Sequence, residues 1–299
     1  MDSRHTRAGL ASKLSDAAII LVLLMVCVVT LYPFLNILAI SLNDSQDSVR
    51  GNIYLWPRVF TLANYQEIFK NPNLSAAFGM SVLRTVVGTL FSLVSTAIVA
   101  YVISRKDFVL SKLMYWMFLI TMYVGGGMIP EFLLVRSLGL TNNFWVYIFP
   151  GLIGGWNVFV TKSFMDGLPS SLQESAKLDG ANDMVIFARI ILPLCAPVLA
   201  TIALFYAVYQ WNSWFDTYIY AGSRVNLTTL QYELMKIITS SNSSAAMMGY
   251  GDKIGQVKSV SPESIRMAIT IVATAPILCV YPFLQKYFVK GLTLGAVKS

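Results

Sequence analysis

Side chains that could perform catalysis are scarce in this chain. His5 is the only histidine and lies in a charged N-terminal stretch, which excludes a His-based triad, an HExxH site and a His-ligated metal. Cys27, Cys195 and Cys279 lie in apolar runs without metal or redox spacing, which predicts small buried side chains. No GxxxxGK[ST] sequence is present, so the chain does not hold ATP through a P-loop. We expect no catalytic residue, no metal and no cofactor in this chain.

The composition is typical of a membrane protein. Of the 299 residues, 56% are hydrophobic and only 12% are charged, and the mean hydropathy is +0.63. Soluble domains carry roughly 25% charged residues. The net charge of +7 is scattered over loops and a tail, which argues against a nucleic-acid partner. The lipid bilayer is therefore the expected environment.

Six apolar stretches are each long enough to cross a hydrocarbon core roughly 30 Å thick. We predict an all-α integral membrane protein with six transmembrane helices over residues 17–284, a cytoplasmic tail over 1–16 and another over 285–299. A cleaved signal peptide is the alternative for the first stretch, but its apolar core exceeds the usual ~7–15 residues. The predicted spans are 17–42, 85–104, 113–130, 144–161, 194–215 and 267–284.

Individual residues near the span ends have simple structural interpretations. Arg84 is expected to extend toward the interface at the outer end of the second span. The glycines at 125–127 are expected to break the third helix. The GxxxG spacing of Gly151 and Gly155 permits close helix packing.

The distribution of Lys and Arg indicates the orientation. Slightly more than half of the 22 Lys and Arg residues share the side of both termini, and the bias is clearest beside the short loops, where the positive-inside rule applies best. Both termini and the loop 162–193 are therefore predicted to be cytoplasmic.

The longest charged segment between two predicted spans covers residues 168–197. Ser170 with Gln173, and Ser171 with Glu174, form two overlapping capping boxes that predict the start of a short helix. Gly180 can end this helix in a left-handed turn.

A second helix should follow that turn. Asn182 or Asp183 can cap its start, and Pro193 is expected to stop it. The segment is thus predicted to form two helices joined by a sharp turn at the membrane surface.

This segment resembles the EAA coupling loop of binding-protein-dependent ABC importer permeases. In that family the loop is the cytoplasmic docking site of a separate ATPase subunit, and alanine stands where this chain has Ser175. The matching residues are Glu174, Ser175, Ala176, Asp179, Gly180, Ala181, Phe187, Ile190, Ile191, Leu192 and Pro193.

The resemblance implies that closure of the ATPase switches pore access through a rigid-body contact. Residues 172–178 would be a stiff lever, and Glu174 would pair with an arginine of the ATPase. Ala176, Gly180 and Ala181 would permit close approach of the partner. A local capping role is the alternative for Glu174, and one carboxylate can serve both.

Other stretches resemble sugar-importer permeases in the same order along the chain. They include a TLxNY-like run at 60–65, the glycine turn at 125–130, and the tail, in which Gly295 and Lys298 would reach the ATPase interface. The alternatives are an interfacial loop with aromatic anchors for 60–65 and a frayed end for the tail.

Gln210, Trp211 and Asn212 place amide and aromatic groups together near the outer end of the fifth span. Sugars offer apolar ring faces and dense hydroxyls, so these residues are candidates for a substrate path. An interfacial aromatic anchor with helix–helix hydrogen bonds is the alternative.

The resemblance covers nearly the whole chain and is greatest to the second permease of carbohydrate importers, especially those for oligosaccharides such as alginate or pectin fragments. It implies a non-enzymatic subunit of the bacterial cytoplasmic (inner) membrane that forms half of a translocation path. The implied partners are a second permease, an ATPase dimer that binds ATP and Mg, and an extracytoplasmic solute-binding protein.

Three other functions are alternatives. An ABC permease for peptides or amino acids would share the coupling loop. A secondary transporter would need acidic residues at mid-membrane, and the predicted spans contain none. A membrane-embedded enzyme would need a catalytic set, and none is evident.

Overall fold

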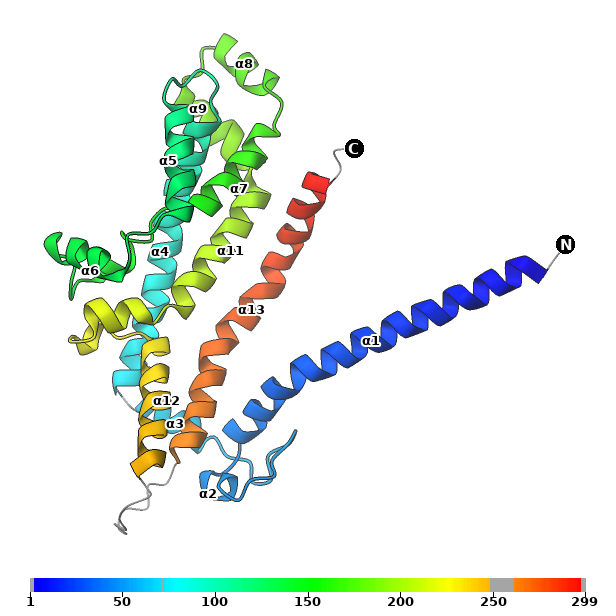
Figure 1. The fold of residues 1–299 in the computed structure, drawn as a ribbon, viewed down its shortest axis with the longest axis vertical. Helices are drawn as coiled ribbons and strands as arrows, with labels where there is room; N and C mark the ends of the chain where they lie inside the picture. Colours follow the sequence, from blue (N-terminus) through cyan, green and yellow to red (C-terminus); the bar gives the residue numbers. More distant parts are fainter. Residues whose placement is uncertain (1–2, 71, 248–260, 297–299) are drawn as a thin grey trace. The chain divides into compact units, whose positions relative to one another are not determined.

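The computed structural model describes residues 3–70, 72–247 and 261–296 (Figure 1). Within these ranges all regular secondary structure is helical, and one isolated β-bridge joins Asn43 to Phe60. The chain divides into two compact units. One comprises Pro72–Lys236 with Ala273–Ser299, and the other comprises Met1–Asn71 with Ile237–Val272. The all-helical prediction is confirmed for the described residues.

The unit that begins at Pro72 is built around one long helix, α4 (Pro72–Ser104). This helix packs against α5 (Ser111–Tyr123), α7 (Gly155–Asp166) and α11 (Ala196–Asn212). The shorter elements of the unit are α6 (Met128–Ser137), η1 (Phe144–Tyr147), α8 (Ser171–Leu178), α9 (Asp183–Ile186), η2 (Phe187–Ile191), α10 (Leu192–Leu194), η3 (Thr217–Ala221) and η4 (Val225–Leu227).

Close packing in this unit depends on one glycine of the predicted pair. A Cβ on Gly155 would lie 3.1 Å from the carbonyl oxygen of Phe118 and 2.9 Å from Cγ of Met122, so glycine lets α7 approach α5. Gly151 lies in a turn outside any helix. The helix-packing prediction therefore holds at Gly155 and is wrong at Gly151.

The other unit contains α1 (Ser3–Ser41), α2 (Ser45–Ser48) and α3 (Ala63–Lys70), while α12 (Leu230–Met247) and α13 (Pro262–Ala296) are each divided between the two units. Asn64 is fully buried and fastens the loop after α1. Its Nδ2 donates to the carbonyls of Ser41 (2.8 Å) and Asn43 (3.0 Å), and its Oδ1 accepts from Ser45 (2.9 Å). In the TLxNY-like run, this asparagine therefore holds the chain's own fold together.

Among the described residues, three helical stretches are long and apolar enough to cross a bilayer: Ser15–Ser41, Pro72–Ser104 and Glu263–Val280. A fourth results if Asp183–Leu194 and Ala196–Asn212, bent by 81°, form one span. The third and fourth predicted spans fall on α5 and α7. These have 13 and 12 residues, or only about 20 and 18 Å at about 1.5 Å per residue. The described residues thus confirm several apolar helices but not six continuous spans.

Glycine and proline explain where the helices differ from the predicted spans. The break at 125–127 is confirmed, because α5 ends at Tyr123 and Gly127 precedes α6 with a φ of +84°. The predicted span 144–161 is wrong as one helix. It is interrupted between η1 and α7, where Pro150 supplies no amide hydrogen.

Three further boundaries are also wrong. The second helix begins at Pro72, well before residue 85, because proline is favoured in the first turn of a helix. Helix α1 already starts at Ser3, within the predicted tail, and all of α12 lies between the predicted spans 194–215 and 267–284. The predicted spans end where the polar residues begin, but a helix can continue beyond its apolar part.

The three cysteines differ in exposure. Cys195 is buried as predicted, whereas Cys27 and Cys279 are exposed on α1 and α13. The prediction is wrong for these two because an apolar side chain in a bilayer needs no cover from the protein.

Candidate functional site

The charged segment 168–197 contains the sharp turn that its glycine predicts. Helix α8 ends in front of Gly180, whose φ is +81°. The amide of Ala181 donates to the carbonyl of Ala176 (2.9 Å) and that of Gly180 to Lys177 (3.0 Å), the two bonds of a Schellman motif. No atom lies within 4 Å of a Cβ on Gly180, so the backbone angle, and not close packing, calls for glycine.

The start of α8 differs from the prediction. Ser170 has a helical conformation and makes no side-chain capping bond, because a capping serine needs a non-helical backbone to reach the exposed amides. The predicted capping boxes are therefore absent, and Glu174 is exposed.

The second helix begins as predicted and ends differently. Asn182 is the cap, since its Oδ1 accepts from the amide of Val185 at 2.9 Å. Pro193 does not stop the helix. A π turn precedes it, in which Leu192 donates to the carbonyl of Phe187, and the chain bends only at Cys195. The π turn shifts the hydrogen-bond register next to the proline, which accommodates its missing amide hydrogen.

The residues of the EAA-like set divide into a buried and an exposed group. Ala176 and Phe187 belong to the chain's own core, and the Phe187 ring lies 5.0 Å from that of Tyr101. Ala181 is half-buried. The exposed members are Glu174, Ser175, Asp179, Gly180 and Pro193.

Two large apolar side chains are exposed in the same segment. Leu178 is 89% exposed and Met184 is 71% exposed. We call Glu174, Leu178, Asp179 and Met184 the α8 surface. Large exposed apolar groups near charged ones are typical of a surface that another protein covers.

Arg105 connects the end of α4 to this segment. It is 9% exposed, and its Nη1 donates to Oε1 of Gln173 in α8 at 2.8 Å. Its Nη2 lies 3.1 Å from Oδ1 of Asp183 in α9. Asp107, which accepts from Arg105 (2.9 Å), also accepts from Lys177 of α8 (2.9 Å). The short loop after α4 is thus tied to both helices of the segment by charged groups.

These contacts define the charge state of the cluster. Hydrogen bonds from Arg105, and then from Lys177, hold the pKa of Asp107 well below its ordinary value. The bond to Asp107 in turn raises the pKa of Arg105. Asp107 is therefore ionised throughout the physiological pH range, and its contribution to stability is lost only as the pH falls below about 4.

The three residues predicted for a substrate path have different surroundings. Gln210 is fully buried, and its Nε2 donates to the carbonyl of Tyr147 at 3.0 Å. Trp211 is buried, and its Nε1 donates to the carbonyl of Ala273 at 2.7 Å. Asn212 is exposed and accepts from Gln231. In the isolated chain, only Asn212 presents its side chain to the exterior.

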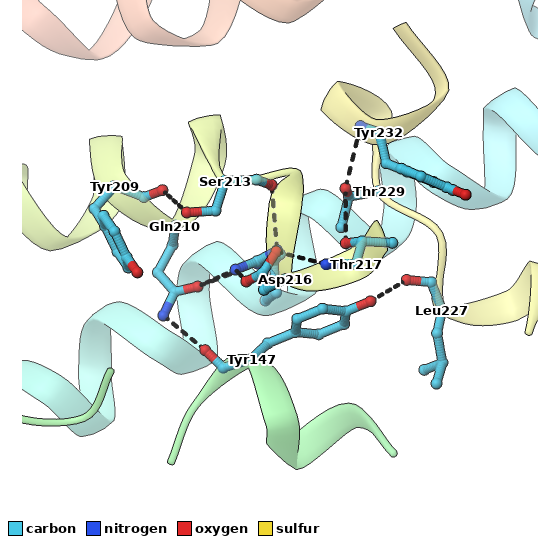
Figure 2. Close-up of polar contacts among 10 residues, drawn as sticks. Tyr147, Tyr209, Gln210, Ser213, Asp216, Thr217, Leu227, Thr229 and Tyr232 are labelled. Carbon is cyan, nitrogen blue, oxygen red and sulfur yellow. Dashed lines mark hydrogen bonds and ion pairs between the residues drawn. The ribbon is translucent and has the colours of Figure 1, made fainter. Parts of the chain in front are cut away.

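Gln210 belongs to a buried polar cluster centred on Arg84. Figure 2 labels Gln210, Tyr147 and Asp216 of this cluster. Arg84 is 1% exposed and forms an ion pair with Asp216, in which Nη1 lies 3.1 Å from Oδ1. Its Nε donates to Oε1 of Gln210 at 3.1 Å, and its guanidinium carbon lies 4.3 Å from the ring centre of Tyr147. The expectation that Arg84 reaches the interface is wrong, because α4 continues past it and Asp216 neutralises it within the fold.

The cluster continues into the segment after α11. Figure 2 shows the Tyr147 hydroxyl donating to the carbonyl of Leu227, a bond of 2.6 Å. Asp216 also accepts from the amide of Thr217 at 2.8 Å. The cluster therefore ties α4, η1, α11 and the irregular segment after α11 into one rigid end.

Gly88→Ala is expected to disturb this cluster. A Cβ at Gly88 would lie 2.6 Å from Nε2 and 2.7 Å from Cδ of Gln210, so the amide must leave Arg84 and Tyr147. We expect the free energy of unfolding to fall by about 1–3 kcal/mol, as for other overpacked cores. The unfolding midpoint of the purified chain in detergent measures this. Gly79→Ala in the same helix has open space and should not lower it; an equal response of both variants would contradict the packing argument.

The roles of Arg84, Arg105, Asp107 and Asp216 could not be predicted from the sequence. Arg84 and Asp216 stand 132 residues apart in the chain, and no local pattern relates them.

The tail residues Gly295 and Lys298 are predicted to contact an ATPase. Gly295 lies in the last turn of α13, and Lys298 is outside the described residues. Among the described residues, no group of three His, Cys, Asp or Glu is arranged to hold a metal ion.

Apolar helices of membrane-crossing length, together with an exposed helix–glycine–helix turn, place the chain among helical membrane permeases. The family described as binding-protein-dependent transport system inner membrane component matches residues 75–294, and the chain belongs to this family. The predicted family is therefore confirmed.

Curated relatives and solved structures agree with this membership. The chain is 38% identical to the polygalacturonan/rhamnogalacturonan transport system permease protein YtcP of Bacillus subtilis (strain 168), over 96% of this chain and 99% of that protein. It is also 38% identical to Protein LplC of the same organism, over 99% and 97% of the two chains. A chain in the crystal structure of a bacterial ABC transporter that imports the acidic polysaccharide alginate matches with a TM-score of 0.83 and 26% identity, over 93% of this chain and 98% of that chain.

Proposed function

We propose that this chain is one of two permease subunits of an ATP-driven importer of acidic oligosaccharides in the bacterial cytoplasmic membrane. The α8 surface is the observation that carries the proposal. Leu178 and Met184 are large apolar side chains exposed beside carboxylates, an arrangement typical of a surface that binds another protein. An ATPase subunit that binds ATP and Mg would cover this surface from the cytoplasm, with a basic side chain opposite Glu174.

The Arg105 cluster supports a way to transmit the motion of such an ATPase. A displacement of α8 would act on Arg105 and Asp107 through Gln173 and Lys177. Because Arg105 directly follows α4, the displacement passes into a helix that runs unbroken to the Arg84 cluster. Rigid-body movement of packed helices is a common route for switching access to a site.

The substrate class is supported by the relatives. The names of two similar proteins specify polygalacturonan or rhamnogalacturonan and alginate, all of which contain uronate units. The complete transporter would comprise this chain with six spans and both termini cytoplasmic, a second permease, an ATPase dimer and an extracytoplasmic solute-binding protein.

The test is to tag the chain in its native membrane, extract it in mild detergent and identify the proteins that co-purify. We expect an ATPase with a P-loop and a second permease, and import of trigalacturonate into liposomes only with ATP and the solute-binding protein. A chain that purifies alone and transports without ATP would contradict the proposal in favour of a secondary transporter. Import of peptides instead of saccharides would overturn the substrate class alone.

A further inference from the structure

A cavity of about 350 Å³ lies apart from the α8 surface and the Arg84 cluster, within the unit that begins at Pro72. It opens between α6, the loop after α6, and the segment from η3 to the start of α12. In Figure 1, α6 and the segment after α11 lie on the same side of the α4 helix. Its volume is within the range of about 300–1,000 Å³ that small-ligand sites occupy.

Aromatic rings form much of the wall of this cavity. Phe132 of α6 and Tyr220 of η3 are stacked, with ring centres 6.0 Å apart and planes inclined by 11°. Tyr218 and Tyr232 form a second pair, with ring centres 6.5 Å apart. Flat rings with hydroxyl groups at the edge suit a ligand that has both apolar faces and polar edges.

One polar atom in the wall has no partner. Asn142 adopts a left-handed φ of +54°, and its amide donates to the carbonyl of Tyr220 at 2.8 Å. Its side-chain Oδ1 is buried and accepts no hydrogen bond from the described residues. A buried acceptor without a donor is costly. Because Oδ1 is covered as the side chain lies, a turn of the Asn142 side chain toward the cavity would be needed for a ligand hydroxyl to satisfy it.

The cavity also carries a cation. Arg136 in the last turn of α6 lines it and is exposed. Among the ion pairs of the described residues, none includes Arg136. A guanidinium group offers two parallel N–H donors that match the two oxygens of a carboxylate. A neutral sugar has no carboxylate, so Arg136 favours an acidic one.

We propose that this cavity binds one uronate unit of an acidic oligosaccharide. The carboxylate would contact Arg136, the apolar ring face would lie on the aromatic wall of Phe132 and Tyr220, and a sugar hydroxyl would donate to Oδ1 of Asn142. The inference rests on the proposed function and deepens it, since it assigns selection for acidic saccharides to named residues of this chain.

The test measures binding of trigalacturonate to the purified transporter complex in the absence of the solute-binding protein, by calorimetry. The neutral trisaccharide made by reducing its carboxyl groups is the comparison ligand. We expect the complex to bind trigalacturonate about tenfold more tightly than the neutral form, as a charge-assisted hydrogen bond implies. Arg136→Gln should abolish this difference, and Arg136→Lys should retain part of it, because lysine keeps the charge and loses the paired donors.

Arg224→Gln is the matched control, because Arg224 is also exposed and lies outside the cavity. It should keep the preference for the acidic ligand. An unchanged preference for the acidic ligand in Arg136→Gln would contradict the proposed uronate site. A lowered affinity for the solute-binding protein with unchanged saccharide binding would also contradict it.

The same variants are assayed for ATP-dependent import in liposomes. If wild type imports no saccharide, the proposed function fails; if it imports acidic saccharides and Arg136→Gln does so equally well, only this site fails.

Discussion

Asp216→Asn is expected to lower the free energy of unfolding by about 3–5 kcal/mol, the usual cost of removing one partner of a buried ion pair. Arg84 is 1% exposed, so its charge has no access to water when the carboxylate is removed. Gln210 and the carbonyl of Ser213 accept hydrogen bonds from the same guanidinium group, but neither carries a negative charge. Chemical unfolding of the purified chain in detergent measures the change.

Two other variants isolate the effect of burial. Asp166→Asn removes the exposed pair with Lys162 in α7 and should cost less than about 1 kcal/mol. Replacing both partners, as in Arg84→Met with Asp216→Leu, should be less harmful than Asp216→Asn, because no unpaired charge remains. If Asp216→Asn cost no more than Asp166→Asn, the Arg84 cluster would not be the rigid buried unit described above.

Glu174→Lys is expected to reduce ATP-dependent import by at least about 30-fold, because loss of a buried interfacial charge pair costs about 2–5 kcal/mol. The substitution reverses a charge on the α8 surface, which the proposed ATPase covers. Glu174 is exposed and makes no capping bond, so the chain itself should remain folded. Co-purification of the ATPase and uptake in liposomes measure the loss.

Glu67→Lys is the matched control, since it makes the same charge reversal at an exposed position of α3 in the other unit. It should retain both the ATPase and the uptake. Normal uptake by Glu174→Lys would contradict the proposal that the ATPase docks on the α8 surface. Equal loss in both variants would show that net charge, rather than this position, controls activity.

Local signals predicted the coupling segment well. The left-handed Gly180 and the capping Asn182 depend on neighbouring residues, so their types and spacing carry the necessary information. The capping boxes failed because Ser170 adopts a helical backbone, which residue types alone do not specify. The glycine break at 125–127 succeeded for the same local reason.

Contacts between distant parts of the chain could not be predicted in this way. Arg84 was placed at a span end because apolar composition begins there, whereas the helix starts at Pro72 and buries Arg84 against Asp216. The family resemblance implies that Ala176 permits close approach of a partner, whereas in the fold Ala176 packs in the chain's own core. Only the packing of α8 against its neighbours decides which residues of the segment face outward.

The sequence by itself determined the membrane class, the helical fold and the family, because apolar composition and a spaced local motif are properties of the linear chain. Only the tertiary structure decided that Arg105 and Asp107 hold the coupling segment, that Arg84 and Asp216 form a buried pair, and that Arg136 and Asn142 share a cavity. The physical reason is that burial and partner choice arise when helices far apart in the chain pack together, and a single sequence contains no record of which residues then meet.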